Sequence, residues 1–272
     1  MMTFFSRLAA LGLGIVAGAA AAPALAAPDV AEIVARANHA AYYQGQDGRA
    51  RVDMTIRNGQ GRESSRRFTI LRLDNGPADR DGEQSFYVYF NRPADVNRTA
   101  FLALKRPGGG DDRWLYLPAL DLVKRIAPSD ERTSFIGAHF FYEDVSGRDP
   151  ARDSHQLVEE TDAYYVLEST PKQPEQVEFA RYKSWIHKAS FIPVKIEYTD
   201  AAGAVYRVYE ALAVDRIGDY PTVTRARMTD TRIGGETVMS YSQVDYDIGL
   251  DAAVFTEQSL RNPPRRFLRS GE

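Results

Sequence analysis

The side chains of this sequence that could perform chemistry are few, and their spacing limits what they could do. The 272 residues include four histidines and no cysteine, so neither a thiolate nucleophile nor a disulfide can form. The sequence contains no Gly-x-Ser-x-Gly elbow and no His-Glu-x-x-His helix, which are the usual motifs of acyl-transferring hydrolases and zinc proteases. We therefore expect that the protein is not an enzyme.

The best remaining candidates for catalysis or metal binding are His139 and Glu143, which are four residues apart. On a helix this spacing places both side chains on one face, where they could form an acid–base pair or begin a metal site. No third ligand follows from the spacing, and a hydrogen-bonded pair is the simpler interpretation. An envelope hydrolase is thus the weakest of our three hypotheses, and we predict no metal and no cofactor.

The acidic pair Glu143 and Asp144 ends an aromatic segment and has two interpretations. The carboxylates could hold that segment by pairing with an arginine such as Arg125 or Arg148, or they could contact a ligand directly. Arg125 could also lie at a cavity rim, where its paired donors suit a carbonyl or phosphate. We therefore predict Arg125, Glu143 and Asp144 as rim or gate residues.

Nucleotides and nucleic acids are poorly supported as ligands. The glycine run at residues 107–112 lacks the Gly-Lys-Ser/Thr ending and the following helix of a phosphate-binding loop, so it predicts a hairpin turn. The formal net charge is −3, whereas nucleic-acid binding usually needs a basic face. We therefore expect no nucleic-acid partner.

Strand patterns dominate the elements that must position these side chains. Ala50, Val52 and Met54 alternate with polar residues, which predicts a strand with one buried face. Similar segments recur to residue 248 between short turns. We count about 11 strands, which indicates a large antiparallel sheet rather than alternating strands and helices.

Helical patterns are confined to the ends of the chain. Residues 31–43 carry an apolar stripe at helical spacing, and Asp29 can cap this helix. Residues 250–255 predict a short helical turn. The basic residues 261–269 predict a loosely held surface tail.

The segment at residues 84–91 is apolar on both faces, with Phe86, Val88 and Phe90 on one and Tyr87 and Tyr89 on the other. Such an antiparallel strand needs a cover on each side, or one of its faces lines a ligand cavity. The fifteen tyrosines and thirteen phenylalanines suit a site that grips an acyl tail, but they equally suit a dry core. The sequence leaves both alternatives open.

A specific series of motifs lies at residues 113–144. It reads Trp-x-Tyr-x-Pro from Trp114, Lys-Arg-Ile from Lys124, Ser-Phe-x-Gly from Ser134, and Phe-x-Tyr-Glu-Asp from Phe140. This series resembles the outer-membrane lipoprotein-sorting, or LolA-like, family of periplasmic proteins. The element order extends the resemblance over nearly all of the mature chain. His139 departs from the family pattern, so no functional role is carried to it.

The resemblance implies a mainly β fold, in which a half-closed antiparallel β-barrel with helical cover segments encloses an apolar cavity for acyl chains. Residues 135–142 would be part of the cover. The predicted cavity and cover residues are Phe86, Val88, Phe90, Trp114, Tyr116, Phe135, Phe140 and Tyr142.

The N-terminus has the features of a cleavable signal peptide at residues 1–26. Arg7 precedes an apolar, alanine-rich core, and Ala24-Leu25-Ala26 forms a cleavage site. Residues 27–272 are then expected to form a single LolA-like domain. The expected location is the periplasm of a Gram-negative envelope.

Our leading hypothesis is a periplasmic carrier or chaperone that binds acyl chains and takes part in outer-membrane lipoprotein or lipid sorting. An inner-membrane transporter and an outer-membrane acceptor would be its protein partners. The alternative is a non-catalytic partner subunit of an inner-membrane exporter or envelope assembly, because one fold can serve several functions.

Overall fold

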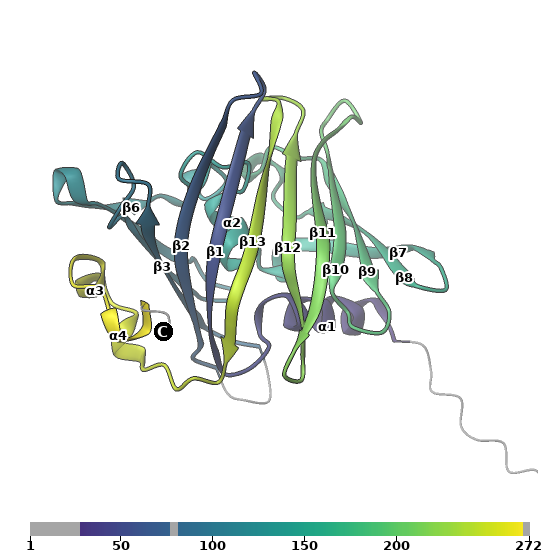
Figure 1. The fold of residues 1–272 in the computed structure, drawn as a ribbon. Coiled ribbons are helices and arrows are strands. Elements are labelled where there is room, and N and C mark those ends of the chain that lie inside the picture. Colours follow the sequence, from purple (N-terminus) through teal and green to yellow (C-terminus); the bar gives the residue numbers. More distant parts are fainter. Residues whose placement is uncertain (1–27, 77–80, 269–272) are drawn as a thin grey trace, which may run out of the picture.

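A computed structural model of the chain describes residues 28–76 and 81–268, and the predicted signal peptide at residues 1–26 lies outside that part. One antiparallel sheet of 13 strands dominates the described residues (Figure 1). The strands are β1 (Asp47–Asn58), β2 (Glu63–Asp74), β3 (Gln84–Arg92), β4 (Ala100–Lys105), β5 (Asp112–Leu117), β6 (Leu122–Ile126), β7 (Asp153–Glu160), β8 (Tyr164–Pro171), β9 (Arg181–His187), β10 (Pro193–Thr199), β11 (Val205–Ile217), β12 (Tyr220–Asp230) and β13 (Gly235–Tyr246).

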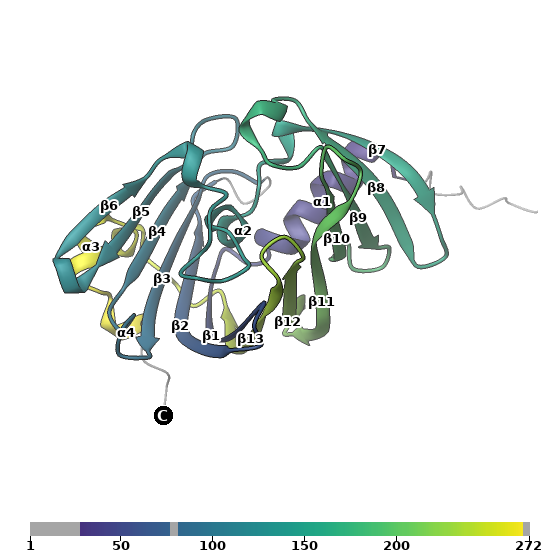
Figure 2. The ribbon, with the colours of Figure 1, turned by 90° about the horizontal axis from the view of Figure 1, so that it is seen from above.

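The order of the strands explains the shape of the sheet. It runs β6-β5-β4-β3-β2-β1-β13-β12-β11-β10-β9-β8-β7, so β1 and β13 pair at the centre while β6 and β7 form the edges. Seen from above, the sheet curls around α1 and α2 without closing (Figure 2). This confirms the predicted half-closed barrel, with 13 strands in place of about 11.

The helices lie on both sides of the sheet. Asp29 caps α1 as predicted, because its carboxylate accepts a hydrogen bond from the Glu32 N–H at 2.8 Å. The α-helices are α1 (Val30–Tyr42), α2 (Tyr142–Ser146), α3 (Glu257–Arg261) and α4 (Arg265–Leu268). The 3-10 helices are η1 (Pro118–Leu120), η2 (Pro128–Asp130), η3 (Pro150–Arg152), η4 (Pro174–Gln176) and η5 (Ala252–Val254).

Residues 127–152, here called the connecting segment, join the two edge strands through the hollow of the sheet (Figure 2). Phe135 is fully buried at the centre of an aromatic cluster, with ring centroids 5.7 Å from Phe90, 5.6 Å from Phe101 and 5.5 Å from Tyr142. These rings pack against strands β2–β4, so the connecting segment fills the half of the hollow formed by β1–β6.

The C-terminal residues cover the opposite face of the same strands. Leu250, Phe255 and Leu260 are buried against Tyr87 and Leu102 on β3 and β4. Strand β3 therefore has a cover on each side, which is one of the two alternatives predicted for it. The prediction of a loose tail is wrong for residues 261–268, because α4 packs on the same cluster; Arg269 lies outside the described residues.

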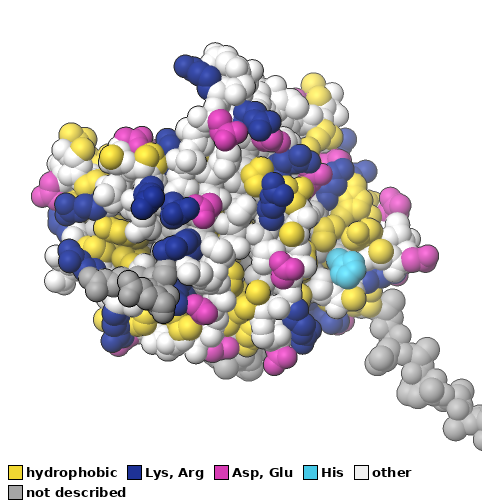
Figure 3. All heavy atoms as spheres, in the orientation of Figure 1, with side chains coloured by type: hydrophobic (Ala, Val, Ile, Leu, Met, Phe, Trp, Pro, Cys, Tyr) yellow, Lys and Arg dark blue, Asp and Glu magenta, His cyan; other side chains and the backbone are white. Residues whose placement is uncertain are grey.

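The outer face of the central strands carries mixed charges (Figure 3). Ion pairs join neighbouring strands there, such as Arg67 with Asp53 and Arg227 with Glu210, each at 2.6 Å. Because this face is charged and solvated, the apolar surface of β10–β13 is directed inward, toward α1 and α2.

Candidate functional site: an apolar cavity beside a buried ion cluster

A cavity of about 380 Å³ lies in the half of the hollow that the connecting segment leaves open. Helices α1 and α2 form one side of the cavity, and strands β8–β13 together with β1 and β2 form the other. Aliphatic, methionine and tyrosine side chains form most of the lining. They include Val34, Ile70, Val145, Leu167, Ile186, Ile192, Ile196, Val223, Met228, Met239 and the tyrosines Tyr42, Tyr198, Tyr209 and Tyr241.

Four of the residues predicted from the sequence line this cavity: Phe86, Phe140, Glu143 and Asp144. The other predicted residues lie elsewhere in the fold. Val88 and Phe90 on β3 are buried in one core cluster with Phe135 and Tyr142 of the connecting segment, and Trp114 and Tyr116 belong to the cluster under the C-terminal helices. Arg125 is exposed on β6.

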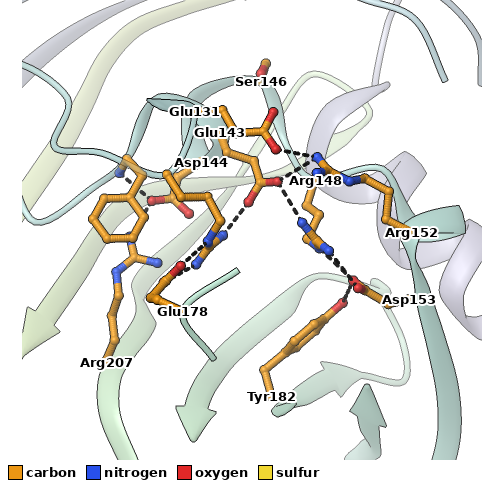
Figure 4. Close-up of polar contacts among 12 residues, drawn as sticks. Glu131, Glu143, Asp144, Ser146, Arg148, Arg152, Asp153, Glu178, Tyr182 and Arg207 are labelled. Atoms are coloured by element: carbon orange, nitrogen blue, oxygen red, sulfur yellow. Dashed lines mark hydrogen bonds and ion pairs between the residues drawn. The ribbon is translucent and has the colours of Figure 1, made fainter. Parts of the chain in front are cut away.

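Glu143, on α2, is the centre of a buried ion cluster (Figure 4). Its carboxylate accepts hydrogen bonds from Arg148 at 2.9 Å and from Arg152 at 3.2 Å, and it also pairs with Arg132. Arg148 in turn holds Asp153, at the start of β7, through two N–H groups at 2.8 Å each. These bonds tie the connecting segment to the second half of the sheet.

Further contacts attach the segment to the second half of the sheet. Arg132 donates two hydrogen bonds to Glu178, at 2.7 and 2.8 Å. Arg207, which is fully buried on β11, pairs with Asp144 and donates to the carbonyl of His139 at 2.9 Å. Paired donors of this kind fix orientation as well as distance.

The arginines control the ionisation of the buried acids. Burial alone would raise the pKa of Glu143, but Arg132 and Arg148 lower it below its ordinary value. At Glu178 the same opposition, burial against the hydrogen bonds from Arg132, lowers the pKa to about 2. Both carboxylates are therefore charged at neutral pH.

The arrangement tests the predicted partners of the acidic pair. Arg148 pairs with Glu143, as proposed from the sequence. Arg125 pairs with Asp112 instead, because β6 lies at the edge of the sheet whereas Glu143 is inside the hollow. The predicted pairing of Arg125 with Glu143 is therefore not formed. Sequence reasoning missed three partners, Arg132, Arg152 and Arg207, and no local motif would have identified them.

His139 is not on a helix with Glu143, because α2 begins only at Tyr142. Its ring nitrogens lie 2.8 Å from the Thr237 hydroxyl and 3.1 Å from the Gly234 carbonyl oxygen. These contacts join the connecting segment to the turn before β13. Among residues 28–76 and 81–268, no group of three or more acidic or histidine side chains could hold a metal ion.

Gly147 lets α1 and α2 approach each other closely. Its φ is +79°, and a Cβ atom there would lie 2.7 Å from the ring of Tyr42. Glycine alone combines this backbone conformation with that contact at low cost. The ring of Tyr42 is thereby held at the boundary of the cavity.

In the described part of the chain, no helix is both long and apolar enough to cross a membrane.

Solved structures with this fold are similar to the chain over most of its length. A DUF1329 family protein from Desulfovibrio piger has a TM-score of 0.76 and 28% identity, covering 84% of this chain and 96% of its own. A protein from Vibrio parahaemolyticus, assigned as an outer membrane lipoprotein-sorting protein domain, has a TM-score of 0.74 and 28% identity, covering 85% and 97%. A LolA superfamily protein from Nitrosomonas europaea shares the fold, with a TM-score of 0.65 and 21% identity over 85% and 99%.

The comparison with curated proteins gave no match. A family model described as "Uncharacterized protein" matches residues 82–262, which is more than half of the 272-residue chain. This match covers β3 to α3 and thus includes the connecting segment and most of the cavity wall. The chain therefore belongs to the family that this model describes, and it is LolA-like in fold and in its solved structural relatives.

Proposed function

We propose that this protein is a carrier that binds acyl chains of lipids or lipoproteins in the cavity between α1, α2 and strands β8–β13. The observation that carries the proposal is an apolar cavity of about 380 Å³ in a LolA-like half-barrel. Ligand sites in proteins have volumes of about 300–1,000 Å³, so this cavity is large enough for part of a chain.

The chemistry of the lining supports reversible binding. Each buried methylene group contributes about 0.8 kcal/mol, so an alkyl tail gains affinity in proportion to its buried length. The side chains Ile186, Ile192 and Ile196 offer such contacts without reactive groups. The proposal therefore assigns the protein no catalytic step.

We further propose that residues 27–272 form one domain that acts in the periplasm after removal of residues 1–26. The export features of the sequence and the lipoprotein-sorting assignment of the Vibrio relative support this location. A membrane transporter that loads the carrier and an acceptor that unloads it would then be its partners. N-terminal sequencing of the secreted protein should find Ala27 as the first residue.

Native mass spectrometry tests the carrier proposal directly. The mature protein is purified from its own periplasm without detergent, and the bound species is extracted and identified. A stoichiometric lipid or acylated peptide would support the proposal. A mass without ligand, together with no uptake of added lipids, would overturn it in favour of the partner-subunit alternative.

A pair of tryptophan variants locates the binding site. Val223→Trp on β12 places a large ring in the cavity, since Val223 is part of the lining. Val158→Trp is the control, because Val158 is 45% exposed on the edge strand β7. We expect Val223→Trp to abolish uptake of a fluorescent fatty acid and Val158→Trp to retain it. Equal uptake by both variants would place the ligand elsewhere.

A further inference from the structure

Six tyrosines line the cavity, and four of them, from four different elements, form a set because their hydroxyl groups have no oxygen or nitrogen partner within residues 28–76 and 81–268. They are Tyr42 on α1, Tyr198 on β10, Tyr209 on β11 and Tyr241 on β13. Sites that recognise small molecules commonly combine an apolar wall with a few polar groups that converge from separate elements. The four hydroxyl groups are therefore candidates for a recognition site inside the cavity.

The hydroxyl groups of this tyrosine set lack protein partners. Tyr42, Tyr198 and Tyr209 donate no side-chain hydrogen bond within the described part of the chain, and Tyr241 contacts only the Met239 Sδ atom, at 3.4 Å. The hydroxyl oxygens of Tyr42, Tyr198 and Tyr209 are not sealed inside the protein, so they face accessible space.

Tyrosines outside this set behave differently. The hydroxyl of Tyr182 donates to Asp153, that of Tyr206 to Glu178 and that of Tyr87 to the Ser259 carbonyl oxygen, each at 2.8 Å. Buried tyrosine hydroxyls usually find such a partner. Tyr182 also lines the cavity, as does Tyr246, whose hydroxyl lies 2.9 Å from the Thr222 hydroxyl. The fold thus pairs two of the cavity tyrosines and leaves the four of this set without such a partner among the described residues.

Burial and the neighbouring groups keep the four phenols of the set protonated. Burial raises the pKa of Tyr42, and the nearby groups Asp144, Tyr209, Tyr198 and Tyr241 raise it further, in that order. Burial raises the pKa of Tyr198 and of Tyr241 to about 12. All four phenols therefore remain protonated at neutral pH, and each can donate a hydrogen bond.

The charges beside the tyrosine set favour a neutral ligand group over an anion. Among the residues that line the cavity, three arginines (Arg49, Arg72 and Arg148) are matched by three carboxylates (Glu143, Asp144 and Asp245). The arginines of the adjacent ion cluster are likewise matched by at least as many carboxylates, so no excess positive charge faces the cavity. The arginines are Arg113, Arg132, Arg148, Arg152 and Arg207, and the carboxylates are Asp111, Glu131, Glu143, Asp144, Asp153 and Glu178. A buried anion without such excess charge would be costly.

We propose that Tyr42, Tyr198, Tyr209 and Tyr241 form a hydrogen-bonding subsite for the carbonyl oxygen of an ester carried by the bound acyl chain. This inference rests on the proposed carrier function and narrows its substrate class to acyl esters. A carbonyl oxygen accepts two hydrogen bonds and carries no net charge. The ester lies against the tyrosine set, and the alkyl chain extends along the apolar lining.

The experiment compares two ligands that differ only at the carbonyl. They are 1-palmitoylglycerol, an ester, and 1-O-hexadecylglycerol, its ether analogue, each titrated as a competitor of a fluorescent fatty acid. One or two neutral hydrogen bonds predict that the native protein binds the ester about ten-fold more tightly than the ether. A preference of this size would support the subsite.

Variants assign the preference to the tyrosines. Tyr198→Phe/Tyr209→Phe removes two of the four hydroxyls and keeps both rings, so we expect ester affinity to fall toward that of the ether while ether affinity is unchanged. The control is Tyr220→Phe, because the Tyr220 hydroxyl bonds Asp247 outside the cavity lining. Tyr209→Phe alone serves if the double variant does not fold, and it should remove part of the preference.

The possible outcomes separate the two proposals. Equal binding of ester and ether by the native protein, or an ester preference that the double variant leaves undiminished, would overturn the subsite and leave the carrier function standing. Binding of neither ligand, together with no uptake of the fluorescent fatty acid, would overturn the carrier function and the subsite with it.

Discussion

Glu143 shares its carboxylate among Arg132, Arg148 and Arg152 in a site that excludes water. Glu143→Gln removes the negative charge while keeping the size of the side chain. Breaking a buried ion pair from one side costs about 3 kcal/mol or more, because the remaining charges stay buried without compensation. We expect the free energy of unfolding in urea to fall by that amount.

A matched exposed pair provides the control for this change. Glu63 lies 3.5 Å from Arg57, and both side chains are more than half exposed. Glu63→Gln should change the free energy of unfolding by less than about 1 kcal/mol. If the two variants lose equal stability, the buried cluster does not hold the connecting segment.

Because the pKa of Glu178 is lowered in the folded protein, the free energy of unfolding depends on pH in the acidic range. In the folded protein this pKa is about 2, below its ordinary value of 4.5. The stabilisation from ionised Glu178 is therefore complete above pH 4.5 and is lost as the pH falls from 4.5 toward 2. Urea unfolding at a series of pH values across this window should show the decline. Glu178→Gln should make the decline shallower, and an unchanged slope would contradict the assignment.

The sequence predicted only part of this residue-scale chemistry. The acids Glu143 and Asp144 and the partner Arg148 could be identified because they lie within six residues of one another in the sequence. It could not reveal Arg207, because its pairing with Asp144 depends on how a distant strand packs over α2. The tyrosines of the cavity were missed for a related reason. Three members of the tyrosine set are on separate strands and Tyr42 is on α1, so they come to line one cavity only through the register of the sheet and the packing of α1 on it.

Among the elements, the strands were the easiest to predict. Alternation along β1 and glycine turns between strands are local properties, and they identified an antiparallel sheet correctly. The position of the cavity was harder. Apolar residues on β3 suggested a cavity wall, yet the connecting segment packs against that half of the sheet and the cavity forms on the other half. Which half is filled depends on tertiary packing.

The C-terminal helices are a structural cover rather than a loose tail. Leu260 is only 1% exposed, packed against β3 and β4. Leu260→Ala should lower the free energy of unfolding by about 2–5 kcal/mol, through lost burial and the space left behind. Chemical denaturation followed by tryptophan fluorescence measures this change.

Leu120 is the matching leucine at an exposed site, since it is 70% exposed in η1. Leu120→Ala should change stability by no more than about 0.5 kcal/mol. If Leu260→Ala were equally harmless, the C-terminal residues would contribute nothing to the core and the cover on β3 would need another explanation.

At the scale of the whole molecule, ligand binding and folding are linked. The walls of the cavity come from α1, the connecting segment and the six strands β8–β13, and they are together only in the folded protein. A ligand that occupies the cavity therefore binds the folded state alone. At a concentration 100 times its dissociation constant, 1-palmitoylglycerol should stabilise the native protein by about 2.7 kcal/mol. Thermal unfolding with and without the ester measures the shift, and Val223→Trp should show none.

The pairing of β1 with β13 has a consequence for how the molecule is made. Arg51 and Ser242 are neighbours in the sheet although they are near opposite ends of the described chain. The two halves of the sheet meet where β1 pairs with β13, so this pairing cannot form until β13 has left the ribosome. Contacts between such distant residues also make folding slow. Under the export proposed above, this topology would postpone the native state until translocation is complete.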